Sequence, residues 1–204
     1  AAIEAVVRLL VDSASDVRCV AVRALGRLAE KGDLRVIGAV SRRLKDTDVS
    51  VRLASLKTLI ELVDVGDKAV VRIIACLVED LDDGVRRDAL QALVKLATLG
   101  DAVVVEAVSK CMHHQDVNER IAAADCMVQI AERGDQVALG ALTACLEHGD
   151  GGLRVKVVSS LAHLAEHGNP AIIRALAWRL EDGDWEVRLA AAKALAQVAE
   201  SGDV

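Results

Sequence analysis

One glycine and one arginine recur along the chain at a constant spacing of 34 residues. The glycines are Gly32, Gly66, Gly100, Gly134, Gly168 and Gly202. The arginines are Arg18, Arg52, Arg86, Arg120, Arg154 and Arg188. A repeat of this length is typical of solenoid proteins, in which each unit buries its apolar face only against its neighbours. The period therefore predicts a single repeat array over residues 1–204.

Each repeat has the apolar pattern of two helices, as in the series Val17, Ala21, Leu25 and Leu28. First helices are expected near 15–31, 49–65, 83–99, 117–133, 151–167 and 185–201. Second helices are expected near 1–11, 34–45, 68–79, 102–113, 136–147 and 170–181. The units lie near 12–45, 46–79, 80–113, 114–147 and 148–181, with partial units at 1–11 and 182–204. Because the links are short, the pattern predicts an all-α solenoid, a right-handed superhelix of about twelve stacked antiparallel helices.

Residues typical of helix ends fall at the same register in every unit. The recurring glycine is expected to end the first helix, since glycine tolerates the left-handed backbone found there. The predicted N-caps of the second helices are Asp33, Asp67, Asp101, Asp135 and Asn169. The only proline, Pro170, follows Asn169 at the first helical position, where its missing N–H costs nothing. The proline therefore supports the register independently of the repeats.

The composition restricts the core and the class of partner. Apolar residues make up 53% of the chain, yet Phe and Tyr are absent and Trp occurs twice. The core is therefore expected to consist of closely packed Ala, Val, Leu and Ile. Stacked aromatic platforms, which many binders of single-stranded nucleic acid use, are disfavoured. The net charge of −6 also provides no overall basic field for a polyanion.

Nothing in the sequence indicates a membrane or a secreted protein. No apolar run reaches the roughly 18 residues of a membrane span, and no signal peptide is visible. The chain opens inside a helical pattern, so we expect a piece of a longer array. The five cysteines form no Cys-x-x-Cys pair, which favours a reducing, intracellular and cytoplasmic setting. They are Cys19, Cys76, Cys111, Cys126 and Cys145.

The segment from Asp182 to Leu195 reads Asp-Gly-Asp-Trp-Glu-Val-Arg-Leu-Ala-Ala-Ala-Lys-Ala-Leu. It resembles the HEAT-repeat signature, in the short form also seen in the phycobilisome-lyase-like group. Tetratricopeptide repeats share the period, but their aromatic positions are missing here, and armadillo repeats carry a third helix. The resemblance implies a solenoid whose second helices line a concave face, and in which the recurring arginine forms a ladder with nearby aspartates.

Two stretches depart from this template. Near residue 117 a valine comes two positions early, and Glu119 takes the usual apolar position. Gly149, Gly151 and Gly152 crowd the start of the fifth first helix, where glycine costs up to about 1 kcal/mol per position. The glycines are either drift in a tolerant turn or a local hinge.

The arginine row is expected to be structural, because it recurs in every unit regardless of any ligand. An aspartate precedes most of these arginines by four residues, a spacing that allows a pair on one helix face. The pairs are Asp48/Arg52, Asp82/Arg86, Asp116/Arg120, Asp150/Arg154 and Asp184/Arg188.

The sequence gives little indication of catalysis or metal binding. His163, Glu166 and His167 share a helix face, and HEAT-like deoxyhypusine hydroxylases bind iron through recurring His-Glu pairs. Here the order is Glu-His and the pairs do not recur, so we expect no metal and no cofactor. A nucleophile motif and a phosphate-binding glycine loop are also missing. We therefore expect no catalytic residues.

Binding specificity is expected where the repeats differ. One register of the second helices reads Arg8, Arg42, Cys76, Lys110, Ala144 and Trp178, and another contributes Arg72 and Arg174. One hypothesis is a groove for an acidic protein segment, with Trp178 as an apolar anchor; the other is ordinary solvated charge. Trp185 is expected to pack against the preceding turn.

The favoured function is a non-enzymatic protein–protein interaction scaffold with a concave helical surface. The alternative, implied only by the resemblance, is a chromophore-lyase-like or other accessory enzyme subunit. Uncapped ends also predict end-to-end self-association.

Overall fold

The computed structural model describes residues 2–199, which form two compact units, 2–98 and 99–199. These described residues form twelve α-helices and no strands, so the all-α prediction is confirmed. Unit 1 contains α1 (Ala2–Arg8), η1 (Leu9–Val11), α2 (Ser15–Leu28), α3 (Leu34–Ser41), η2 (Arg42–Lys45), α4 (Val49–Leu62), α5 (Lys68–Ala75), η3 (Cys76–Glu79) and α6 (Asp83–Leu96). Unit 2 contains α7 (Ala102–Cys111), α8 (Val117–Ile130), α9 (Gln136–Thr143), α10 (Gly151–Leu164), α11 (Pro170–Trp178), η4 (Arg179–Glu181) and α12 (Trp185–Val198).

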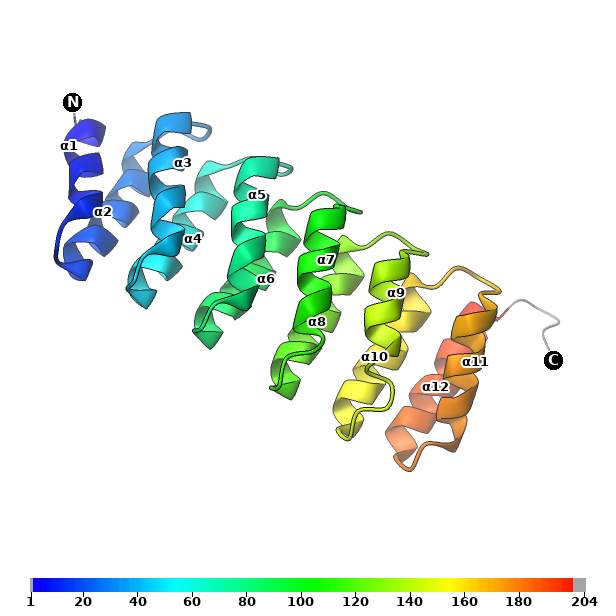
Figure 1. Cartoon of the computed structure of the whole chain (residues 1–204). Coiled ribbons are helices and arrows are strands. Elements are labelled where there is room, and N and C mark those ends of the chain that lie inside the picture. Colours follow the sequence, from blue (N-terminus) through cyan, green and yellow to red (C-terminus); the bar gives the residue numbers. More distant parts are fainter. Residues whose placement is uncertain (1, 200–204) are drawn as a thin grey trace. The chain divides into compact units, whose positions relative to one another are not determined.

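Within each unit the helices stand in two rows, with the odd-numbered second helices in one and the even-numbered first helices in the other (Figure 1). In unit 1, α2 packs on α4 and α4 on α6, while in unit 2 α10 packs on both α8 and α12. Aliphatic side chains such as Leu25, Leu59 and Leu161 fill the space between the rows and are fully buried. The small, non-aromatic core predicted from composition is therefore what lets these helices approach one another closely.

The recurring glycines do not lie where the helices end. The first helices stop at residues such as Leu28 and Leu62, about three residues earlier than predicted, and an extended residue follows each. Gly32 then adopts a positive φ of 84°, as predicted, but its N–H donates to the carbonyl of Leu62 in the next repeat, at 2.8 Å. The same contact recurs at Gly66, Gly100, Gly134 and Gly168, while Gly202 lies outside the described residues. The glycine therefore joins successive repeats instead of closing its own helix.

The predicted caps are confirmed. Each second helix from α3 onwards is capped by the side chain of the predicted aspartate or asparagine, which accepts backbone N–H groups of the first turn. Pro170 occupies the first position of α11. Among residues 2–199, no helix is long and apolar enough to cross a membrane.

Candidate partner-binding site

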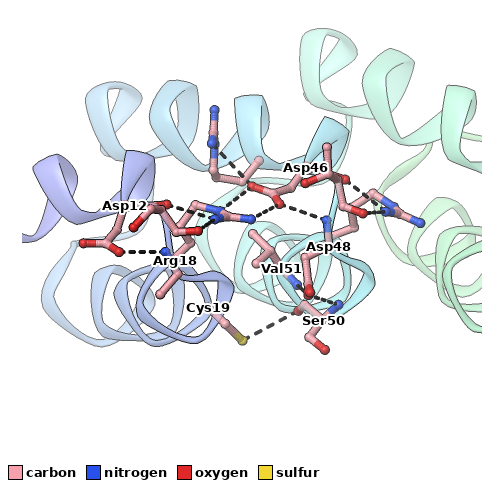
Figure 2. Close-up of polar contacts among 12 residues, drawn as sticks. Asp12, Arg18, Cys19, Asp46, Asp48, Ser50 and Val51 are labelled. Atoms are coloured by element: carbon pink, nitrogen blue, oxygen red, sulfur yellow. Dashed lines mark hydrogen bonds and ion pairs between the residues drawn. The ribbon is translucent and has the colours of Figure 1, made fainter.

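The recurring arginines lie at the contacts between successive repeats. Arg18 donates through Nε and Nη2 to both carboxylate oxygens of Asp46, at 2.9 and 2.7 Å (Figure 2). Its Nη1 donates to the carbonyl of Asp12 at 2.9 Å. Asp46 lies 28 residues further along the chain, at the start of the following repeat. One guanidinium group thus links the turn before its own helix to the start of the next repeat.

The same contact, which we call a rung, recurs elsewhere in both units. Arg154 binds both carboxylate oxygens of Asp182 at 3.0 and 2.7 Å, and Arg52 reaches Asp80 through Nη2 alone, at 2.7 Å. The expected pairing at a spacing of four is therefore replaced by pairing at a spacing of 28. The aspartates at the shorter spacing cap the first helices instead; they are Asp48, Asp82, Asp116, Asp150 and Asp184.

The rungs are charged near neutral pH. Hydrogen bonds from Arg154 lower the pKa of Asp182 and outweigh the opposing effect of burial. At Asp46, burial is the largest single influence and raises the pKa. The hydrogen bonds from Arg18 and the Asp48 N–H, together with the nearby arginines, nevertheless bring that pKa below its ordinary value. Each carboxylate therefore remains ionised beside its guanidinium partner.

The second helices of unit 1 carry an excess of exposed positive charge. Arg8 on α1, Arg42 at the start of η2 and Arg72 on α5 are all exposed, as are Arg35 and Lys45. The only carboxylates on these second helices and their 3-10 extensions are Glu4 and Glu79. The whole chain carries a net charge of −6, so the charge on the second helices of unit 1 is opposite in sign to that of the chain as a whole.

The second helices of unit 2 have a different surface. A groove of about 500 Å³ lies between α9 and α11. Its lining consists of Thr143, Ala144, Leu146, Glu147, Ala175, Trp178 and Arg179. Trp178 is 67% exposed, so the indole is available to a partner, and the small Ala144 and Ala175 leave room beside it. Lys110 and Arg174 are exposed on α7 and α11.

Trp185 departs from the expectation that it packs against the preceding turn, since 62% of it is exposed. Together with Leu189 it lines a second groove, of about 510 Å³, between α10 and α12 on the first-helix side. The reason is its register: it is the first residue of α12, on the side of the helix turned away from the core.

No metal or thiol chemistry stands out among the described residues. In residues 2–199, no group of three or more His, Cys, Asp or Glu side chains could hold a metal ion, and His163, Glu166 and His167 are all exposed. The five cysteines are free thiols. Burial raises the pKa of Cys126 to about 12, so this thiol serves as a small buried hydrophobic side chain.

Two sets of interacting residues escaped the sequence analysis. The aspartates that complete the rungs, Asp46, Asp80 and Asp182, share one register, which holds His114 and His148 in two other repeats. Arg43 and Arg179 also share a register, and both bind the carboxylate three residues later and a carbonyl of the preceding repeat. Comparing positions 28 residues apart would have found the first set.

Comparisons with known proteins agree with this architecture. A family profile described as HEAT repeats matches residues 3–94 and 147–204. A comparison with curated protein sequences found no significant match.

Several solved structures share the fold. A designed armadillo repeat protein in complex with the peptide (KR)4 has a TM-score of 0.64 and 16% identity, over 97% of this chain and 100% of that one. The archaeal HEAT-like repeats protein from Thermococcus onnurineus NA1 has a TM-score of 0.56 and 20% identity, over 97% and 87%. Human deoxyhypusine hydroxylase in complex with glycerol has a TM-score of 0.54 and 19% identity, over 97% and 73%. These similarities establish a repeat solenoid, a fold typical of binding scaffolds.

Proposed function

Since the chain belongs to the HEAT-repeat family, we propose that it is a non-enzymatic scaffold whose second helices bind an acidic protein segment. The observation that carries this proposal is the basic second-helix side of unit 1. There, exposed Arg8, Arg42 and Arg72 lie on successive second helices or their 3-10 extensions in a chain that is acidic overall. Charge of one sign on one side of a protein steers an oppositely charged partner and selects against others.

Unit 2 offers an apolar contact of its own. Exposed tryptophan beside a groove is a common binding anchor, because its large surface loses little conformational entropy when it is covered. Arg174 lies one helical turn before Trp178, so a carboxylate beside an apolar side chain of the partner would meet both. Lys110 is the remaining predicted contact residue.

A binding experiment can test the electrostatic part directly. The probe is a fluorescein-labelled peptide of eight glutamates, with an eight-glutamine peptide as its neutral counterpart, and the readout is fluorescence anisotropy. Arg42→Glu combined with Arg72→Glu should weaken binding of the glutamate peptide several-fold and reduce its salt dependence.

The matched control reverses Arg23 and Arg27, which are exposed on the first-helix side of the same unit. This control changes the net charge by the same amount but leaves the second helices untouched. Equal losses in the two double variants would show non-specific attraction and overturn the proposed surface. Unchanged binding in the Arg42/Arg72 variant would do the same.

End-to-end association and a cytoplasmic location stay predictions. Light scattering over a concentration range tests the first, and imaging of the tagged protein in its source cells tests the second.

A further inference from the structure

The groove beside Trp178 is built across a boundary between two repeats. Thr143 and Ala144, on one side, belong to the repeat at 114–147, whereas Ala175 and Trp178 belong to the repeat at 148–181. The width of the groove therefore depends on how firmly these two repeats are held together.

Boundaries of the same kind are held by a buried charge cluster in both units. At the boundary before Asp46, the carboxylate binds Arg18 at two points and also Arg43, 3.4 Å away. At the boundary before Asp182, the carboxylate binds Arg154 in the same way and also Arg179, 3.6 Å away.

The carboxylate and one of the two arginines of that cluster are exchanged at the groove boundary. His148 occupies the register of Asp182, and Cys145 occupies the register of Arg179. Nδ1 of His148 accepts the N–H of Asp150 at 3.1 Å, so its local role in the turn is kept. Arg120, the arginine of this boundary, donates through Nε to the carbonyl of His114, at 2.5 Å, and Arg18 and Arg154 make the equivalent bond to a carbonyl through Nη1. The register that supplies a carboxylate at Asp46, Asp80 and Asp182 supplies an imidazole at His148, as it also does at His114.

The remaining polar contacts across this boundary include an ion pair of Arg179 with exposed Glu147, whose N–O distance is 4.0 Å. Lys156 and Asp125 form an ion pair at 2.7 Å, but their side chains are 36% and 54% exposed. Exposed pairs of this kind contribute little, because water competes for both charges. Arg179 donates to the carbonyl of Leu146 at 2.9 Å, and Gly134 donates to Leu164 at 2.8 Å.

Two glycines lie close to the groove boundary. A Cβ at Gly151 would collide with the carboxylate of Asp184, so this glycine has a packing role at the following boundary. Gly149 has open space around it and lies in the turn that connects the two repeats of the groove, and Gly183 has the same register and the same open space in the turn before α12, where the rung of Asp182 is present. Glycine at such a point leaves the turn free to change its backbone angles.

We propose that the groove between α9 and α11 is adjustable: the boundary at residues 147–150 opens to seat a large apolar side chain of the partner against Trp178, while the boundaries that carry a rung stay closed. The apolar part of the lining, formed by Ala144, Leu146 and Ala175, and the 67% exposure of Trp178 identify the occupant as a leucine or phenylalanine side chain. This binding role rests on the proposed scaffold function, but the opening itself does not.

Amide hydrogen exchange of the protein without any partner tests the opening. Residues 147–154 should exchange about tenfold faster than residues 45–52, their register equivalents, after correction for intrinsic rates; tenfold corresponds to about one charge-assisted hydrogen bond. His148→Asp should slow exchange at 147–154 by restoring a carboxylate for Arg120. Asp46→His should make the reciprocal change at 45–52. Equal exchange in the two segments of the wild-type protein, or no response to either substitution, overturns the proposal.

A second measurement tests the link to binding. The probes are two glutamate octapeptides, one with a central phenylalanine and one with a central alanine. The wild-type protein should prefer the phenylalanine peptide, and His148→Asp should reduce that preference several-fold. An unchanged preference refutes the role of the opening in binding. If neither peptide binds, the proposed scaffold function is refuted. The hydrogen-exchange experiment uses the protein without a partner, so it tests the opening of the boundary separately.

Discussion

The rung between Arg154 and Asp182 offers the sharpest test of how this chain is held together. We consider a double-mutant cycle in which Arg154→Leu and Asp182→Ala are made singly and together. Two hydrogen bonds of 3.0 and 2.7 Å join the side chains, which are only 14% and 4% exposed. The cycle isolates the interaction between them from the other bonds that each side chain makes.

The expected coupling follows from the burial and the charge of the pair. A charge-assisted hydrogen bond contributes about 1.5–3 kcal/mol, and two that share one guanidinium group do not add fully. The bonds of Arg154 to the carbonyls of His148 and Gly149 do not involve Asp182, so they cancel in the cycle. We therefore expect a coupling free energy of about 2 kcal/mol.

The control is a second cycle on Lys156 and Asp125. This ion pair has the same N–O distance of 2.7 Å but is far more exposed, so its coupling should be below about 1 kcal/mol. Urea unfolding followed by tryptophan fluorescence is the appropriate assay, because both tryptophans, Trp178 and Trp185, flank the rung in sequence. Equal coupling in the two cycles would refute the argument that burial, and not distance, makes the rungs strong.

Further predictions follow from burial, charge and backbone geometry. Leu161→Ala should lower the free energy of unfolding by about 2–5 kcal/mol, because the side chain is fully buried and a cavity would remain; urea titration measures this. Asp182 has a lowered pKa, so its stabilisation should be present above the ordinary carboxyl value of 3.8 and lost as the pH falls through the folded-state value. In Asp182→Asn, acid unfolding monitored by circular dichroism should therefore show a shallower loss of stability in that range. A thiol reagent at pH 8 should modify exposed Cys76 first and leave Cys126 unmodified in the native protein, since burial raises the pKa of Cys126 to about 12; peptide mass mapping would show the order. Gly66→Ala should destabilise by about 1–2 kcal/mol, because φ is +86° and the new Cβ would lie 3.2 Å from a methyl group; thermal unfolding reports the loss.

Several features could be predicted because they depend on residues close together in the chain. The helix caps, the position of Pro170 and the positive φ of the glycines follow from backbone hydrogen bonding over a few residues. The ends of the first helices were placed too late, since an extended residue and a turn precede the glycine. Its N–H serves the next repeat, an acceptor that the pattern within a single repeat does not reveal.

The candidate site was predicted less completely. Arg42 and Arg72 were expected to be exposed on the second helices, and they are. A groove with Trp178 as its anchor was one of the two hypotheses, but its lining was not foreseen, because it needs Ala144 and Ala175 to lie across from each other on two different repeats. Trp185 was misplaced for a related reason: its exposure depends on which side of α12 faces the core.

The sequence by itself determined the period, the helical class and the local caps, because each of these depends on residues within one repeat and recurs in the other repeats. Only the tertiary structure decided that Arg154 pairs with Asp182 and not with Asp150, and that His148 leaves one boundary without its carboxylate. The physical reason is that contacts between repeats depend on the offset at which neighbouring helices stack. That offset brings each of these arginines into contact with the aspartate 28 residues later. The aspartate four residues before the arginine instead caps the helix.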